Sequence, residues 1–310
     1  MLNILKTTEE GLRHLDDFEP GAWVDLVSPT EIEITRVAER FDIPLSFLRG
    51  PLDEEEKSRI DVEGRLVYVI VDIPVMARSE VDTLYDTLPL GILLHPDAVI
   101  TLCLRTNPIL GDFERGVAGS IETFKKTRLL LLVLLRISSY YLRYLKRIDR
   151  ETDKLERELR ASMKNRELFE LLNIQKALVY FSTSLQSNEV VLQKLLRGKT
   201  VKMYEEDEDL LEDVIVENKQ AMEMASIYSN ILTGMMDAFG SVISNNLNMV
   251  MKLLTSITIV LAVPAIVAGF FGMNVKVPLV ENPYGFLIVV GMSVVLAVAA
   301  TVLFWRKRYF

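Results

Sequence analysis

The chain has 310 residues, with 43 acidic against 35 basic side chains and a formal net charge of −8 at pH 7. This acidic balance argues against nucleic acid as a partner. The single cysteine, Cys103, excludes an internal disulfide and fits a reducing compartment. The acidic stretch 1–20 has no apolar core, so we expect no signal peptide there.

The region before residue 119 predicts a mixed α/β fold. Apolar runs of strand length, rich in β-branched residues, recur along it. The expected strands cover residues 22–27, 65–75, 88–94 and 98–104, with His95-Pro96-Asp97 as the turn between the last two.

A helix is expected over residues 30–40, after the first of these strands. The sequence Ser28-Pro29-Thr30-Glu31 predicts its start. In this interpretation Ser28 is the N-cap, Pro29 occupies the first helical position and Glu31 closes a capping box.

From about residue 119 the chain is predicted to be helical. Residues 129–135 are seven consecutive aliphatics, too few to span a membrane, and predict a buried helix face. A charged helix is expected to reach Lys164, and a second to cover residues 168–196 before residues 197–200 interrupt it. A third begins near residue 208, and if it is continuous it has about 65 residues and a length of ~97 Å.

Two uncharged apolar runs, residues 253–272 and 286–305, are each long enough to cross a ~30 Å hydrocarbon layer as a helix. Only residues 273–285 separate them, so we expect a helical hairpin with a short loop. This loop carries one base, Lys276, and one acid, Glu281.

Basic residues flank the outer ends of the hairpin. Lys252 precedes the first span, and Arg306-Lys307-Arg308 follows the second. An excess of lysine and arginine marks the cytoplasmic side of a membrane. We therefore expect a multi-pass protein of the cell membrane, with both termini and the large N-terminal part in the cytoplasm.

Alternate steps of four and three along the long helix select residues that are nearly all polar or small. They are Asp237, Ser241, Ser244, Asn248, Met251, Thr255, Thr258, Ala262, Ala265, Gly269 and Gly272, called the stripe below. A stride of 3.5 residues keeps one face turned toward a supercoil axis, where an ordinary coiled coil places large apolar residues.

Two interpretations of the stripe remain open. Small residues and hydroxyls favour close packing of membrane helices. Asp237, Asn248 and the two threonines instead favour a wet pore lined by a ring of identical helices. In a pore, Met251 and Leu254 predict a hydrophobic constriction, which can gate by dewetting.

The tripeptide Gly272-Met273-Asn274 follows Phe271 at the end of the first span, and Pro264 lies inside that span. The segment 248–255, Asn-Met-Val-Met-Lys-Leu-Leu-Thr, leads into it, and the C-terminus is basic. In these features the chain resembles the CorA-type magnesium transporters. The similarity covers the whole chain but is weak before about residue 200.

The resemblance implies a funnel-shaped homopentamer, with an α+β cytoplasmic domain, a long helical stalk lining the pore and two C-terminal transmembrane helices. Gly272, Met273 and Asn274 would form the selectivity filter, with five Asn274 carboxamides at the external mouth. Mg²⁺ gives up its waters reluctantly, and amide oxygens can hold a hydrated ion loosely. Ala265 departs from relatives that carry a pore hydroxyl at that position.

The resemblance also implies that cytoplasmic Mg²⁺ binds regulatory carboxylates between neighbouring subunits. Asp213 matches the family's position on the long helix, and Asp53 and Glu54 are candidates for the partner position, because the matching residue falls near Gly50. A solvated acidic helix start accounts for most of the eight acids among residues 205–217.

The predicted layout has seven parts. They are a cytoplasmic α/β domain (1–118), a helical segment (119–207), the stalk (208–252), the first span (253–272), an external loop (273–285), the second span (286–305) and a basic cytoplasmic tail (306–310).

The predicted function is uptake of Mg²⁺ down its electrochemical gradient, gated by cytoplasmic Mg²⁺, with lipid bilayer and divalent cations as partners. The same scaffold carrying Zn²⁺, Ni²⁺ or Co²⁺ is an alternative, and a non-transporting membrane scaffold is a more distant one. Zinc sites favour His and Cys, and the chain has only His14, His95 and Cys103. An enzyme is not expected, because the sequence shows no nucleophile arrangement and no phosphate loop.

Overall fold

The computed structural model describes residues 1–78, 83–119, 121–162, 165–198, 200–275, 277–279 and 282–307. The chain divides into two units, Met1–Thr233 and Gly234–Phe310. The first unit contains a sheet and most of the helices. The second contains the rest of helix α6 and all of helix α7.

A seven-stranded mixed sheet forms the α/β part of the first unit, in the order β2-β1-β3-β7-β6-β5-β4. Its strands are β1 (Leu2–Thr8), β2 (Gly11–His14), β3 (Ala22–Val27), β4 (Arg59–Glu63), β5 (Leu66–Arg78), β6 (Thr83–Leu94) and β7 (Ala98–Cys103). All neighbours are antiparallel except β3 and β7, which run parallel.

The helices follow in order along the chain. They are α1 (Glu31–Phe41), α2 (Leu45–Arg49), a 3-10 turn η1 (Gly50–Leu52), α3 (Pro108–Glu114), α4 (Lys126–Ser162), α5 (Asn165–Arg197), α6 (Glu205–Phe271) and α7 (Gly285–Arg306). The 67-residue α6 is continuous, as the sequence predicts, and contains Pro264.

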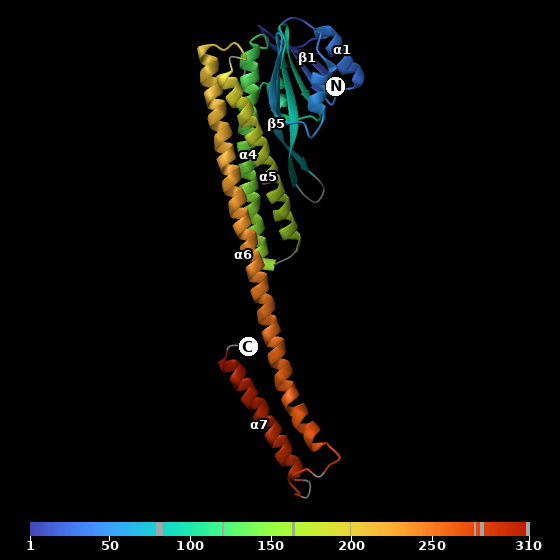
Figure 1. Cartoon of the computed structure of the whole chain (residues 1–310), viewed down its shortest axis with the longest axis vertical. Helices are drawn as coiled ribbons and strands as arrows, with labels where there is room; N and C mark the ends of the chain where they lie inside the picture. The colour runs from blue at the N-terminus through green and yellow to red at the C-terminus, as the bar shows by residue number, and fades with distance from the viewer. Residues whose placement is uncertain are drawn as a thin grey trace. The chain divides into compact units, whose positions relative to one another are not determined.

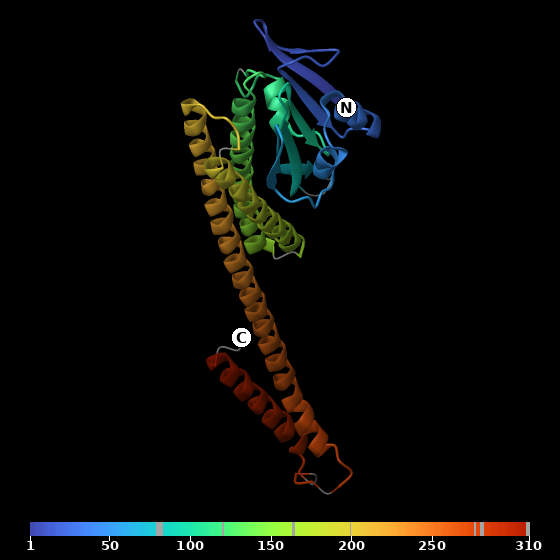
Figure 2. The same ribbon diagram turned by 45° about the horizontal axis from the view of Figure 1, so that its top comes forward.

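Helices cover both faces of the sheet (Figures 1 and 2). On one face α1 packs its buried Ile34 and Val37 against Val24 and Leu26 of β3. On the other face lie α4 and α5, which contact β5 and β6. The aliphatic run 129–135 belongs to α4 and is largely buried, which confirms the predicted buried helix face.

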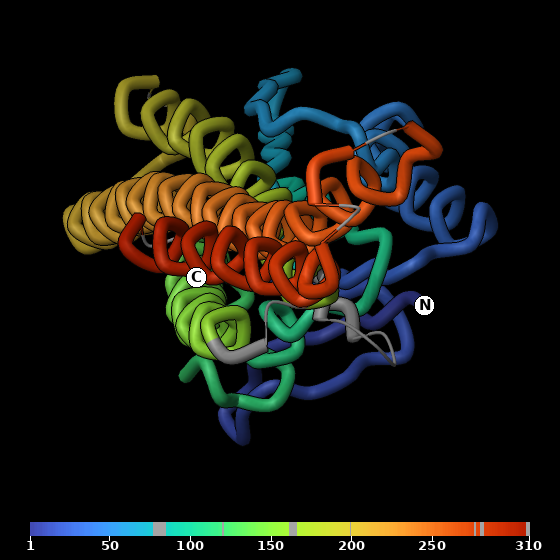
Figure 3. Tube along the Cα trace, turned by 90° about the horizontal axis from the view of Figure 1, so that it is seen from below, coloured from blue at the N-terminus to red at the C-terminus, as the bar shows by residue number. Residues whose placement is uncertain are grey.

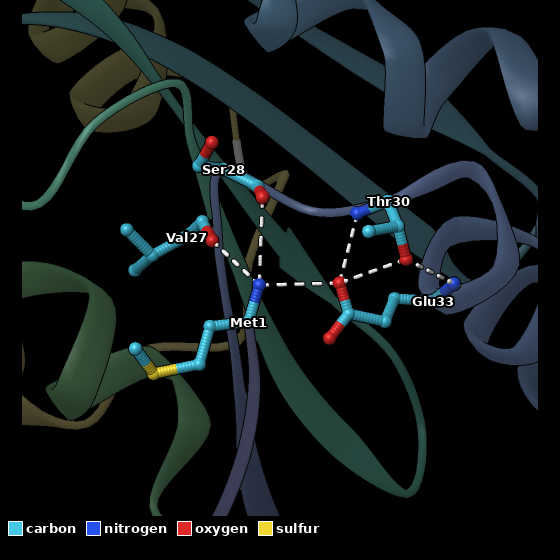
Figure 4. A network of polar contacts seen from close by, with 5 residues as sticks. All are labelled: Met1, Val27, Ser28, Thr30 and Glu33. Atoms are coloured by element: carbon cyan, nitrogen blue, oxygen red, sulfur yellow. Dashed lines mark hydrogen bonds and ion pairs between the residues drawn. The ribbon is translucent and has the colours of Figure 1, made fainter.

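The predicted start of α1 is wrong by two residues. Thr30, not Ser28, is the N-cap, and the capping box is closed by Glu33 and not by Glu31. Ser28 is unavailable because its N–H donates to the carbonyl of Cys103, which prolongs the β3–β7 ladder, and its φ is +44°. Figure 4 shows the box. A carboxylate oxygen of Glu33 accepts hydrogen bonds from the Thr30 N–H (2.8 Å) and the Met1 nitrogen (3.1 Å).

The four predicted strands are confirmed as β3, β5, β6 and β7, and the turn at residues 95–97 joins the last two. Both β5 and β6 are longer than predicted, because they pair across a hairpin from Val67↔Leu94 to Arg78↔Thr83. Pro74 lies inside β5. Proline lacks an N–H, but it is tolerated here because β4 begins only opposite Ile70. Beyond Ile70, β5 therefore has no strand on its β4 side that would need this N–H.

In the second unit, α7 runs alongside the last part of α6 (Figure 3). Both helices are long and apolar enough to cross a membrane. A crevice between them is lined by small or apolar residues of both helices, among them Pro264, Ala268 and Gly272 of α6 and Ser293 and Ala297 of α7. The Ser293 hydroxyl donates back to the carbonyl of Val289 at 2.9 Å, so it needs no other partner.

Candidate functional site

The Gly272-Met273-Asn274 tripeptide lies where α6 ends. The last helical residue is Phe271, and the Gly272 N–H still donates to the carbonyl of Ala268 at 2.8 Å. A Cβ on Gly272 would lie 3.0 Å from that carbonyl oxygen, so a side chain would be crowded there. Met273 and Asn274 are exposed, and the Asn274 carboxamide is accessible just beyond the helix end.

The residues that follow this tripeptide form a short loop before α7. Glu281, the acid predicted in it, lies outside the described residues, as does Lys276. Leu279 has φ +76°, and a Cβ on Gly285 would come within 2.4 Å of the Leu279 carbonyl oxygen. The Leu279 backbone therefore packs directly against Gly285 at the start of α7, and the space between them leaves no room for a side chain at position 285.

The first part of the stripe, residues 237–248, forms a polar surface on α6. Asp237, Ser241, Ser244 and Asn248 line one shallow hollow together with Asn245. All five side chains are exposed within a single chain. The Ser241 hydroxyl donates to the Asp237 carbonyl at 3.0 Å. The surface offers a carboxylate, amides and hydroxyls to whatever faces it.

The later part of the stripe, which lies in the predicted first span, is also exposed apart from half-buried Ala262. Thr255, Thr258, Ala265 and Gly269 are exposed, and so are Met251 and Leu254 at the predicted constriction, with 52% and 57% of their surface accessible. Between residues 240 and 271, the buried residues are Ser256 and Val267. On a helix with 3.6 residues per turn these two share a face, and the stripe lies on the other side of α6.

The predicted regulatory acids lie in the first unit, and the structure does not bring them together within one chain. Asp213 is exposed on α6. Glu54 forms an ion pair with Arg105 at 2.6 Å, and an Asp53 carboxylate oxygen accepts the Glu55 N–H at 3.1 Å. Within the described ranges, no group of three or more metal-binding side chains occurs.

Gly50, near which the partner position falls, is a packing residue. A Cβ there would lie 3.0 Å from the Tyr68 hydroxyl and 3.4 Å from a carboxylate oxygen of Glu56. Glu56 in turn pairs with Arg59. A side chain at position 50 would therefore be crowded against the buried Tyr68 hydroxyl.

Two buried amides, Asn188 of α5 and Asn218 of α6, were not predicted from the sequence. They are 4% and 1% exposed. Each is hydrogen-bonded across an element boundary, Asn188 to β5 and Asn218 to α5. Their sequence signal is faint, because an asparagine on the apolar face of a predicted helix is the only sign of such a contact.

Comparison with known proteins gives a consistent result along the whole chain. The sequence matches the family described as CorA-like Mg²⁺ transporter protein over residues 19–308. It is 29% identical over 296 residues to the cobalt/magnesium transport protein CorA of Methanocaldococcus jannaschii, covering 93% of this chain and 90% of that protein. It is 21% identical over 310 residues to the protein of the same description from Thermotoga maritima, covering 98% and 88%.

A solved structure agrees with the sequence matches. The complete structure of the CorA magnesium transporter from Methanocaldococcus jannaschii aligns with a TM-score of 0.86 at 27% identity, covering 100% of this chain and 99% of that one. The α/β region, the long helix and the two C-terminal helices are thus matched together.

Proposed function

The chain belongs to the CorA-like Mg²⁺ transporter family, and on that premise we propose that it carries Mg²⁺ into the cell. In this proposal the protein transports divalent cations and has no enzymatic activity. The observation that carries the proposal is the position of Gly272-Met273-Asn274 directly after Phe271, the last residue of a 67-residue helix with a polar stripe. That position puts an exposed carboxamide at one end of the proposed pathway.

The proposed pore is a ring of five α6 helices, with α7 on the outside. The exposed stripe supports it, because Thr255 lies in the proposed first span and would otherwise face lipid or another helix. Asp237 and Asn248 continue the same polar line along the stalk. The bulky pair Met251 and Leu254 forms the gate in this arrangement. The seven-part layout described above follows, with both termini in the cytoplasm and the loop 273–285 outside.

The filter chemistry suits a hydrated ion. Mg²⁺ keeps its water shell in most protein sites, and carboxamide oxygens can accept hydrogen bonds from those waters without stripping them. Neutral ligands also release the ion more readily than carboxylates do. Met273 packs and does not coordinate, because a thioether is a soft ligand and Mg²⁺ a hard ion. The membrane potential contributes ~4.6 kcal/mol per 100 mV for a divalent cation, which suffices to drive uptake.

Cytoplasmic Mg²⁺ regulates this pore in our proposal. Asp213 of one subunit and the segment with Asp53 and Glu54 of its neighbour hold the ion between them. The exposure of Asp213 supports this role, because it leaves the carboxylate accessible to an ion. Binding of the ion favours the closed state and gives negative feedback.

Flux into liposomes tests the proposal. Asn274→Ala should reduce Mg²⁺ uptake to background while the oligomer still assembles, as judged by size-exclusion chromatography. Val275→Ala, which shortens the exposed neighbouring side chain, is the matched control and should transport normally. Wild-type flux through Asn274→Ala would refute the filter, and a panel of Mg²⁺, Co²⁺, Ni²⁺ and Zn²⁺ on the parent protein decides among the ions.

A further inference from the structure

Two consecutive residues of α5 connect the sheet to α6. Asn188 contacts β5, and Glu189 contacts α6. The Asn188 side chain pairs with both backbone groups of Asp72. It accepts the Asp72 N–H at 2.8 Å and donates to the Asp72 carbonyl at 2.8 Å. This is the pattern in which a peptide group of a neighbouring strand would pair.

The reason lies at the start of β4. Its first residue, Arg59, pairs with Ile70, so β5 has no neighbouring strand at Asp72 on the side opposite β6. The buried amide of Asn188 replaces the missing peptide group, and an unpaired backbone pair would be costly there. Ser58, directly before β4, donates from its hydroxyl to the same Asn188 oxygen at 3.0 Å.

Glu189 makes the second contact. The Asn218 side-chain amide donates two hydrogen bonds to α5. One goes to a carboxylate oxygen of Glu189 at 3.0 Å, and the other goes to the Leu185 carbonyl at 3.3 Å. The other Glu189 oxygen accepts from Gln193 at 2.9 Å. Asn218 is fully buried on α6, five residues after Asp213 and therefore little more than one helical turn away.

The contacts lie between the two parts of the proposed Mg²⁺ sensor. Ser58 follows Glu56 by two residues, and its hydrogen bond to Asn188 attaches the chain to α5 just after the acidic segment 53–56. Asn218 holds the turn of α6 that carries Asp213 against Glu189. Asn188 and Glu189 are consecutive residues of α5, so the two contacts are joined through a single peptide bond.

We propose that Asn188 and Asn218 are positioning residues that fix the acidic segment 53–56 relative to the Asp213 turn of α6 within each subunit. When an ion binds between neighbouring subunits, movement of the acidic segment 53–56 is then coupled to movement of α6. This inference rests on the Mg²⁺ regulation proposed above.

Mg²⁺-dependent protection from limited proteolysis tests it on the full-length protein. Asn218→Ala removes the contact with Glu189, and Ser58→Ala removes one hydrogen bond to Asn188 while leaving the Asp72 pairing intact. We expect Ser58→Ala to raise the MgCl₂ concentration for half-maximal protection by about fivefold, the factor that one lost hydrogen bond gives, and Asn218→Ala, which loses two, to raise it at least as much. Ser58→Thr keeps the hydroxyl and should restore the parent midpoint, and Gln186→Ala on the exposed face of α5 is the control.

The melting temperature in EDTA separates positioning from simple packing. A lower melting temperature with an unchanged Mg²⁺ midpoint in both variants would overturn the inference. If Asn218→Ala does not fold, Ser58→Ala alone decides, because its change is smaller. A parent protein that Mg²⁺ does not protect would overturn the proposed regulation and this inference together, and the Asn274 flux experiment would be unaffected by that result.

Discussion

The Thr101 hydroxyl donates a hydrogen bond of 2.6 Å to the carboxylate of Asp25 in the middle of the sheet. The two residues face each other on the parallel strands β3 and β7 and are 1% and 2% exposed. The Trp23 indole N–H donates to the same hydroxyl at 2.8 Å. Burial raises the pKa of Asp25 from 3.8 to about 7, the Thr101 bond lowers it, and nearby Glu114 raises it.

This pair makes stability depend on pH. Between pH 4 and 7 the folded protein keeps the Asp25 proton and the unfolded chain releases it, so stability falls as pH rises, by something of the order of 4 kcal/mol. Asp25→Asn removes this titration and should raise the melting temperature at pH 8 relative to the parent, with a much smaller difference at pH 5. Thermal unfolding followed by circular dichroism measures this. Asp16→Asn, at an exposed position, is the control, and an equal shift at both pH values would contradict the prediction.

The α1 capping box gives a second prediction. Thr30→Ala removes the side-chain oxygen that accepts the Glu33 N–H, and it should lower the free energy of unfolding by about 1 kcal/mol. Hydrogen bonding, first of all from the Thr30 backbone N–H, lowers the pKa of the Glu33 carboxyl group. The stabilisation from this carboxylate is therefore lost as pH falls through its folded-state pKa, whereas the bond from the Glu33 N–H to the Thr30 hydroxyl does not titrate.

Urea unfolding measures the Thr30 effect. Thr35→Ala, which removes a hydroxyl inside α1 bonded to the Glu31 carbonyl, is the matched control and should cost much less. Equal losses for the two variants would show that the box is not the source.

Several elements could be predicted because their sequence signal is local. The strand at Ala22–Val27 and the long helix α6 follow from an apolar run and from the absence of helix breakers. The strands β1, β2 and β4 were missed. They are short or polar and owe their pairing to distant residues, such as Leu5 opposite Trp23. Local patterns do not contain that information.

The candidate site shows the same division. The tripeptide after α6 and the stripe are readable because they depend only on the spacing along one helix. The roles of Asn188 and Asn218 could not be predicted from the sequence. They depend on where β4 begins along β5 and on which turn of α6 contacts α5. The predicted N-cap of α1 was wrong because the Ser28 N–H donates to the Cys103 carbonyl, so Ser28 continues the sheet and does not start the helix.

The proposed gate at Met251 gives a third prediction. Met251→Ser replaces a bulky apolar side chain of the stripe with a hydroxyl and should wet the constriction. We expect Mg²⁺ flux into liposomes to rise severalfold when the internal Mg²⁺ concentration is high. Met249→Ser, which changes an exposed methionine off the stripe, should leave the closed state intact. If both variants stay as tightly closed as the parent, the gate lies elsewhere.

The exposed carboxylate of Asp213 gives the last prediction. In the parent, Mg²⁺ should protect the protein from limited proteolysis, because the ion bridges carboxylates of adjacent subunits and favours the closed state. Without the ion these carboxylates repel one another. Asp213→Lys supplies a fixed positive charge in place of the ion, so it should favour the closed state without Mg²⁺, and protection should become independent of Mg²⁺.

Asp209→Lys is the matched control, since it places the same charge on an exposed residue one turn earlier in α6. It should keep the Mg²⁺ dependence of the parent, because a general effect of positive charge on the acidic start of α6 would act at both positions. Protection that still requires Mg²⁺ in Asp213→Lys would remove Asp213 from the sensor. The acids of α6 would then be explained by their favourable interaction with the helix N-terminus and with solvent.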